Sequence, residues 1–301
     1  MIATLRETCR QLLSDGKVDV VIGYGHDAAA DGAEDAPVYP VFITKPEDAG
    51  RLVWNDRCHA NLAVYLKHEE IRSLGRAAII VKGCDQRSLV VLEKESQLDR
   101  SKIYVIGIAC DGLDRPKCRT CDVHEPRGAD VIIGHKAAGT GYPCAGGVPS
   151  ANGTQGLPDT LPDDRYAELR AFLARPSAER LAYWRQELAR CVKCYACRQV
   201  CPMCYCRRCI VDKNRPQIIS TSATLKGNFA WHITRAFHLA GRCVGCEECS
   251  RACPMGIDLR LLNLSVAQAA EENFAFRAGD DPAAEPVIGS YAIQDKEDFI
   301  R

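Results

Sequence analysis

Two stretches of this chain carry the same pattern, CVKCYACRQVCP at residues 191–202 and CVGCEECSRACP at residues 243–254. Each stretch places four cysteines at the spacing C-x2-C-x2-C-x3-C and follows the last cysteine with proline. Cysteines at this spacing bind a cubane [4Fe-4S] cluster, and in two-cluster proteins the fourth cysteine of one run ligates the cluster of the other run. The doubled pattern therefore predicts two clusters with crossed ligand sets, and with them electron transfer.

The crossed arrangement assigns four cysteines to each cluster. We expect the first cluster to be held by Cys191, Cys194, Cys197 and Cys253, and the second by Cys243, Cys246, Cys249 and Cys201. Zinc is the first alternative, because C-x2-C pairs also bind zinc, usually as two pairs about a dozen or more residues apart. Zinc requires neither a third cysteine in each run nor a proline after the fourth. A disulfide framework is the second alternative, but the chain begins MIATLRETCRQLLSDGKVDVV, without a basic start leading into an apolar signal core.

Composition limits the class of protein. The chain has 301 residues, of which 47% are hydrophobic and 26% charged, and its formal net charge is zero. These values predict a globular cytoplasmic protein of about two domains, with no membrane span. Residues 179–215 hold nine Lys or Arg against three acidic residues. We expect Lys193, Arg198, Arg207 and Arg208 to offset cluster charge or dock an acidic partner, or else to form a solvated face, and we expect no nucleic-acid binding.

A Gly/Pro-rich segment divides the chain. Residues 139–162 contain six Gly and four Pro among 24 positions, too many breakers for a helix or strand. Upstream, short β-branched runs alternate with helix-like stretches, which is typical of an α/β fold, whereas the region downstream reads as mainly helical. We therefore expect an α/β domain at 1–138, a linker at 139–163, a mainly α-helical two-cluster ferredoxin-like domain at 164–280 and an extended acidic tail at 281–301.

Periodicity predicts individual elements. Strands are expected within residues 18–24, 36–45, 76–83 and 101–110, and a helix within 59–75. In the second half, Ser177 is expected to cap a helix whose apolar stripe contains Leu181, Trp184 and Leu188 and which leads into the first cysteine run. A further helix is expected to carry an apolar stripe of Phe229, Ile233 and Phe237 and to end at Gly241. The histidines show no metal-binding pattern, so we expect them in the core or on the surface.

Four further cysteines follow or adjoin the ends of predicted strands: Cys84, Cys110, Cys118 and Cys121. In an α/β sheet the carboxyl ends of the strands are where ligands bind, so these thiols could converge on one site. Buried core thiols are the alternative, because free cysteine is among the most buried residue types. Cys204, Cys206 and Cys209 directly follow the first run and remain unassigned between an additional metal site, a contact with another protein and redox-reactive thiols.

The order of these segments resembles a known family. DVVIG at 19–23, PVYPVFITKPEDAGRL at 37–52, a strand-end cysteine at Cys84 and another at Cys110, then a C-x2-C-D loop leading to an Ala-Asp pair, are similar to the beta subunit of deazaflavin-reducing hydrogenase and of deazaflavin-dependent formate dehydrogenase. The resemblance covers about residues 17–140. It implies a third [4Fe-4S] cluster at Cys84, Cys110, Cys118 and Cys121, with FAD beside it.

The second half resembles a different kind of protein. The 41 residues between the two runs, together with GRCVGCEECSRACPMGIDLRLLN at 241–263, are similar to the α-helical ferredoxin domain of heterodisulfide reductase. The two resemblances together imply formate dehydrogenase, hydrogenase or heterodisulfide reductase-like partner subunits in an anaerobe, and hence a hetero-oligomer.

Our leading hypothesis is an iron-sulfur electron-transfer subunit with no catalytic residue of its own. It would relay electrons between a flavin or catalytic subunit and another oxidoreductase. The alternative is an FAD-dependent oxidoreductase of deazaflavin or NAD(P) with its own iron-sulfur relay. Gly134, Gly139 and Gly141 could admit a flavin phosphate, but no helix-opening glycine fingerprint follows a strand, so the residues that would bind FAD are not identified. A zinc module for macromolecular binding is a third class, which the Cys-Pro endings disfavour.

Overall fold

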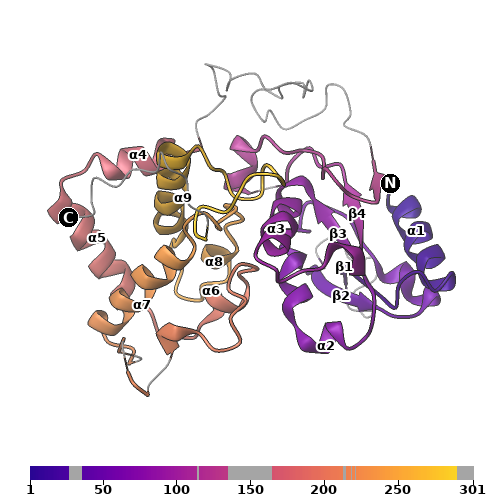
Figure 1. Ribbon diagram of the computed structural model, residues 1–301, viewed down its shortest axis with the longest axis horizontal. Helices are drawn as coiled ribbons and strands as arrows, with labels where there is room; N and C mark the ends of the chain where they lie inside the picture. The colour runs from indigo at the N-terminus through magenta and orange to yellow at the C-terminus, as the bar shows by residue number, and fades with distance from the viewer. Residues whose placement is uncertain are drawn as a thin grey trace. The chain divides into compact units, whose positions relative to one another are not determined.

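The computed structural model describes residues 1–26, 36–113, 115–134, 165–212, 215–217, 219–220 and 222–289 (Figure 1). The chain forms two compact units, one of Met1–Leu89 with Ser96–Arg165 and one of Val90–Glu95 with Tyr166–Arg301. The predicted linker at 139–163 and residues 290–301 of the predicted tail lie outside the described residues. Within the described residues, no helix is both long and apolar enough to cross a bilayer.

A five-stranded sheet of order β2-β1-β3-β4-β5 is the centre of the first unit. Its strands are β1 (Val20–Gly25), β2 (Tyr39–Ile43), β3 (Ala77–Lys82), β4 (Ile103–Ile108) and β5 (Val131–Ile133). Strand β2 pairs antiparallel with β1, and the other neighbours pair parallel, with Ala77 opposite Ile103 and Ile106 opposite Val131. Every residue of β1 and β3 is buried. Continuous apolar runs of this kind are expected of parallel strands covered on both faces.

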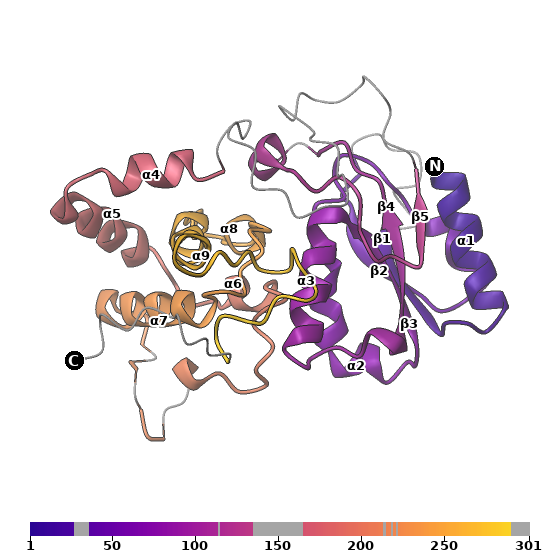
Figure 2. The ribbon, with the colours of Figure 1, turned by 45° about the horizontal axis from the view of Figure 1, so that its top comes forward.

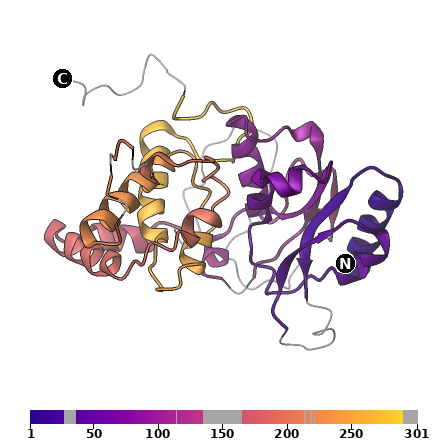
Figure 3. The ribbon, with the colours of Figure 1, turned by 90° about the horizontal axis from the view of Figure 1, so that it is seen from below.

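Helices cover this sheet on both sides. Figures 2 and 3 show α1 (Ile2–Ser14) against one face and the N-terminal part of α3 (Gly83–Lys94) against the other. Helix α1 buries Leu5, Cys9 and Leu12, which recur at steps of three and four residues and so form one helical face. The shorter helices of this unit are η2 (Pro46–Arg51), η3 (Leu62–Lys67), α2 (Glu69–Arg72), η4 (Arg100–Lys102) and η5 (Pro116–Thr120).

The second unit is helical. Its elements are α4 (Ala167–Leu173), α5 (Ser177–Ala189), α6 (Ala196–Gln199), η6 (Ile210–Asp212), α7 (Leu225–His238), α8 (Glu248–Arg251) and α9 (Arg260–Phe274). Helix α7 packs against α5 and α9, and α6 packs against α8. The core between them is aromatic, with Phe172 and Trp184 in edge contact at 5.9 Å and Tyr195 and Trp231 at 5.4 Å. The predicted α/β first half and mainly helical second half are confirmed.

Three element-level predictions differ from the structure. The helix expected within 59–75 is split into η3 and α2, because His68 between them is extended, with φ −79° and ψ 129°. Helix α5 begins at Ser177 itself, with Pro176 at the N-cap position, so the predicted serine cap is wrong. The predicted apolar stripe of α7 is not its buried face: Phe237 is 63% exposed, whereas Asn228, His232 and Arg235 are buried.

Candidate metal centres

The two cysteine runs share one backbone conformation. In the first run Lys193 and Tyr195, the third and fifth residues, have φ of 53° and 60°. In the second run the corresponding residues, Gly245 and Glu247, have φ of 69° and 60°. A side-chain-bearing residue in this left-handed region costs roughly 1–2 kcal/mol, and such strain is characteristic of functional sites. Successive turned amides of this kind form concave anion sites, including many that hold iron-sulfur clusters.

The short helices repeat as well. Helix α6 follows Tyr195, and α8 follows Glu247 at the corresponding place in the second run. After each helix the fourth cysteine donates its backbone N–H to the carbonyl three residues earlier, at 3.3 Å for Cys201 and 3.2 Å for Cys253. The sequence repeat is therefore also a structural repeat, from the first cysteine of each run to the fourth.

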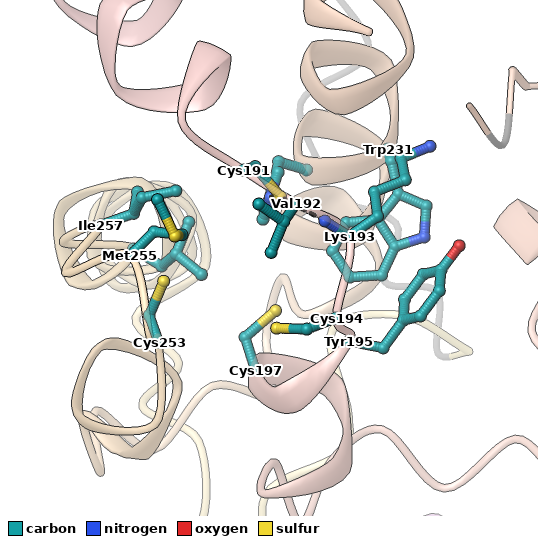
Figure 4. A pocket seen from close by; sticks show the side chains of 12 residues that line it. Cys191, Val192, Lys193, Cys194, Tyr195, Cys197, Trp231, Cys253, Met255 and Ile257 are labelled. Atoms are coloured by element: carbon teal, nitrogen blue, oxygen red, sulfur yellow. Dashed lines mark hydrogen bonds between the residues drawn. The ribbon is translucent and has the colours of Figure 1, made fainter. Parts of the chain in front are cut away.

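A pocket brings together cysteines from both runs. Figure 4 shows the sulfur atoms of Cys191, Cys194 and Cys197 from the first run and of Cys253 from the second around one space. The remaining lining is mostly apolar or aromatic: Val192, Tyr195, Trp231, Met255, Ile257 and Leu259, with Lys193 and His232. This grouping coincides with the first ligand set expected from the crossed arrangement.

A second pocket contains the other four cysteines of the two runs. It is lined by Cys243, Cys246 and Cys249 of the second run and by Cys201 of the first. Its other lining residues include Arg235, Arg260 and Asn263 beside Leu239, Val244 and Leu264. Within the described ranges no three His, Cys, Asp or Glu side chains are placed to share a single metal ion. A cubane does not require this, since its thiolates bind separate irons.

Several N–H groups point at the cysteine sulfurs. The backbone N–H of Lys193 lies 3.4 Å from Cys191 Sγ, and His232 Nε2 lies 3.3 Å from the same atom. In the second pocket Asn263 donates from Nδ2 to Cys249 Sγ at 3.2 Å. Burial lowers the pKa of His232 to about 4, so its ring is neutral and Nε2 can carry the proton that faces sulfur. Hydrogen bonds to thiolate sulfur are a principal means of tuning a cluster.

The thiols in both pockets are shielded from water. Burial raises the pKa of Cys197 to about 12, and it also raises the pKa values of Cys191 and Cys249. The thiolate is the form that binds metal, so loading either site must release protons. The four cysteines, the apolar lining and the inward N–H groups of each pocket fit a thiolate-ligated cluster.

Arg235 is a cation that the sequence patterns did not single out. Its side chain is 4% exposed, its Nη2 donates to the carbonyl of Cys197 at 3.0 Å, and it also lines the second pocket. The thiols of Cys201, Cys249 and Cys197 lie within its electrostatic reach. Asn228, His232 and Arg235 recur at i, i+4 and i+7, and this polar helical face was the available signal.

The basic residues that were singled out have other contacts. Arg198 pairs with Asp212 at 2.6 Å, and Lys193 donates to the carbonyl of Ser220 at 2.8 Å. Arg207 and Arg208 are exposed. Among the unassigned cysteines, Cys206 is exposed, whereas Cys204 is half-buried and lies within electrostatic reach of Cys197 and Arg235.

The first unit brings the remaining four candidate cysteines together. Cys84 opens α3 directly after β3, Cys110 follows β4, and Cys118 and Cys121 lie in and after η5. Because β3 and β4 are parallel neighbours, their carboxyl ends meet at one edge of the sheet. Cys110 and Cys121 each interact electrostatically with both Cys84 and Cys118.

The chain approaches itself closely at this edge. A Cβ atom on Gly83 would lie 2.4 Å from the carbonyl oxygen of Val123, so only glycine admits the loop that follows Cys121. Cys110 and His124 hold that loop with two contacts, from Cys110 N–H to the His124 carbonyl at 2.9 Å and from His124 Nδ1 to the Cys110 carbonyl at 3.0 Å. Burial raises the pKa of Cys110 to about 11 and that of Cys121 to about 12.

A buried lysine lies behind these thiols. Lys82, the last residue of β3, is 1% exposed and pairs with Asp85 at 2.6 Å. Its ammonium also donates to the carbonyl of Cys58 at 3.0 Å. Burial acts to lower the pKa of Lys82, but Asp85 and the thiols of Cys84 and Cys110 outweigh it and raise the pKa. Lys82 therefore stays charged and faces the four-cysteine group.

Comparison with known proteins agrees with these sites. A family profile described as a 4Fe-4S dicluster domain matches residues 190–258, which contain both cysteine runs. The chain is 23% identical to the F420-dependent formate dehydrogenase 1 subunit beta of Methanococcus maripaludis, over 93% of this chain and 91% of that protein. It is 22% identical to the F420-dependent formate dehydrogenase subunit beta of Methanocaldococcus jannaschii, over 83% of this chain and 85% of that protein. The resemblance expected from the sequence is thereby confirmed, and the chain is a homologue of F420-dependent formate dehydrogenase beta subunits with a 4Fe-4S dicluster domain.

Proposed function

We propose that this chain is an iron-sulfur electron-transfer subunit of a multi-subunit redox complex. The observation that carries the proposal is the pair of crossed cysteine quartets, each drawn from both runs and each lined by the side chains of one pocket. In the first pocket Cys191, Cys194, Cys197 and Cys253 would be the ligands. In the second pocket Cys243, Cys246, Cys249 and Cys201 would be the ligands. A [4Fe-4S] cluster bound there would accept and return one electron.

The residues around each quartet have distinct tasks in this proposal. Apolar side chains such as Trp231 and Ile257 keep water from the first cluster, which strengthens every electrostatic interaction within the pocket. His232 and Asn263 donate hydrogen bonds to ligand sulfurs and so stabilise the more negative, reduced state. The exposed Cys194 leaves an edge of the first site open, which suits electron exchange with another protein.

A third [4Fe-4S] cluster at Cys84, Cys110, Cys118 and Cys121 is part of the proposal. Its support is the meeting of four thiols at the carboxyl edge of β3 and β4, with the charged Lys82 behind them to offset a cluster's negative charge. The two units would then both hold redox centres. The complex's partners would be a catalytic subunit and a second oxidoreductase in the cytoplasm, and formate dehydrogenase is the favoured catalytic partner because the relatives bear that name.

A second candidate function is oxidation or reduction of a deazaflavin on this chain, with FAD as cofactor. The name F420-dependent in both relatives favours it. Of the three glycines considered for a flavin phosphate, Gly134 has φ 88°, while Gly139 and Gly141 lie outside the described residues. A flavin absorbance band in the purified chain would support this candidate, and a protein with iron but no flavin would count against it.

The first experiment is to purify the full chain without oxygen and to measure iron and acid-labile sulfide. Each cubane contributes about four of each, so two clusters predict about eight and three predict about twelve. Cys84→Ser should remove about four iron from a twelve-iron protein and none from an eight-iron protein. A wild-type protein with fewer than about eight iron after reconstitution, or with stoichiometric zinc in place of iron, would refute the proposed function.

A further inference from the structure

Helix α7 turns an unusual polar face toward the first cysteine run. Asn228, His232 and Arg235 are 0%, 2% and 4% exposed. Asn228 donates from Nδ2 to the carbonyls of Leu188 and Cys191 at 2.9 and 2.7 Å. One turn along, His232 Nε2 contacts Cys191 Sγ, and Arg235 Nη2 reaches the Cys197 carbonyl. The polar face of α7 is thus built against the first run, and Arg235 stands at its end.

Arg235 also belongs to the second site. It lines the pocket of Cys201, Cys243, Cys246 and Cys249, and its charge acts on Cys201 and Cys249 as well as on Cys197. Cys197 is in the first ligand set, whereas Cys201 and Cys249 are in the second. One guanidinium therefore lies within reach of both proposed clusters.

No carboxylate neutralises this guanidinium in the part of the chain that the structure describes. The neighbouring Arg260, by contrast, pairs with Glu168 at 2.6 Å and Asp258 at 3.0 Å. Arginine does not lose its proton in proteins, and an isolated buried charge is costly, so buried charges are paired. The remaining source of negative charge around Arg235 is the thiolates of the two cysteine quartets and the clusters that they would hold.

We infer that Arg235 is the shared counter-cation of the two clusters and that its charge raises the reduction potential of both. The inference rests on the proposed function. Reduction adds one negative charge to a cluster, and a fixed cation nearby stabilises that added charge. The effect is larger for the second cluster, because Arg235 lines that pocket. As the cation serves both sites, its charge also reduces the repulsion between two reduced clusters.

The test compares potentials in the full chain, titrated anaerobically and followed by electron paramagnetic resonance. Arg235→Met removes the charge, and Arg235→Lys keeps it with a different donor geometry. Arg235→Met should lower the potentials of both clusters at unchanged iron content, with at least a tenfold change in the one-electron reduction equilibrium, or 59 mV, at the second. Arg235→Lys should stay within about twofold of wild type, or about 18 mV. Lys226→Met, on the exposed face of the same helix, should shift neither.

The outcomes separate the inference from the function on which it depends. Wild-type protein without two cubane signals refutes the proposed function before any variant is made. Two intact clusters with unchanged potentials in Arg235→Met overturn the role of Arg235, as do equal shifts in the methionine and lysine variants, because geometry and not charge would then be the cause. If Arg235→Met does not assemble, Arg235→Lys decides: two clusters near wild-type potential support the inference, and loss of either cluster overturns it. Cys204→Ser should leave both potentials unchanged, and a shift as large as that of Arg235→Met would identify Cys204 as the counter-charge instead.

Discussion

The first and second cysteine runs have one backbone and two different surroundings. Both place their third and fifth residues in the left-handed region and follow them with a four-residue helix. The first run, however, has an exposed cysteine at Cys194, flanked in its pocket by Val192 at 55% exposure and Met255 at 36%. The pocket that holds most of the second run contains two arginines and an asparagine that donates to sulfur.

The comparison separates what binds a cluster from what adjusts it. The repeated backbone and cysteine spacing specify the kind of cofactor, and they are the same in both runs. Charge, hydrogen bonds and exposure specify potential and access, and these differ. A relay needs centres that are alike in chemistry but unequal in position and potential, so the differences are where the function of each site is to be sought.

The largest expected effect comes from breaking the crossed ligand sets. Cys253→Ser should remove the first cluster, although Cys253 belongs to the second run, and Cys201→Ser should remove the second cluster. Each variant should lose about four of eight iron from the helical unit. The signal that remains in Cys253→Ser should match the one in Cys194→Ser, and that of Cys201→Ser should match Cys246→Ser, by electron paramagnetic resonance.

The uncrossed alternative makes the opposite pairing. If the fourth cysteine served its own run, Cys253→Ser would match Cys246→Ser in residual spectrum and potential. Cys206→Ser is the control, because Cys206 is exposed and lines neither pocket, and it should retain both signals. A residual spectrum that pairs Cys253→Ser with Cys246→Ser would refute the crossed sets while leaving two clusters in place.

The cysteines themselves were predictable from sequence, for a physical reason. A cluster ligand must be a cysteine, and short fixed spacings restrict which cysteines can reach one cube, so the doubled run and its proline identify all eight. Cys84 and Cys110 were also predictable as neighbours, because parallel strands bring their carboxyl ends to one edge of the sheet.

The adjusting residues were not predictable in the same way. Hydrophobic periodicity favours Phe229, Ile233 and Phe237 as the inner stripe of α7, but Phe237 is 63% exposed and the polar face is buried. Periodicity assumes that apolar residues seek the interior, and the assumption fails where the interior holds polar and charged partners such as the carbonyl and sulfur of Cys191. His232, Arg235 and Asn263 become meaningful only once the fold shows which sulfurs they face.

A smaller effect is expected from the exposed edge of the first site. Val192→Asp places a charge in an apolar surface beside Cys194, and desolvating it on docking should slow electron transfer to the copurified catalytic subunit by about tenfold. Reduction by a small viologen dye should not change, since the dye needs no protein contact. Phe237→Asp, at a more exposed apolar residue outside this pocket, is the matched control. Equal slowing in both variants would mean that docking is not centred on Cys194.

The smallest effect concerns the two hydrogen bonds to sulfur, one in each site. His232→Phe removes the contact at Cys191 Sγ and Asn263→Leu removes the one at Cys249 Sγ, while both keep the side-chain volume roughly constant. Because a hydrogen bond to sulfur stabilises the reduced cluster, each variant should lower one potential by about 30 mV, a roughly threefold change in the reduction equilibrium, and leave the other nearly unchanged. His232→Phe should act on the cluster lost in Cys253→Ser, and Asn263→Leu on the cluster lost in Cys201→Ser. Gln268→Leu, buried on the same helix as Asn263 and paired with Glu272 at 2.8 Å, should shift neither potential. If both sulfur contacts instead shifted the same cluster, the two pockets would not hold separate centres, and the difference between the runs would be one of packing alone.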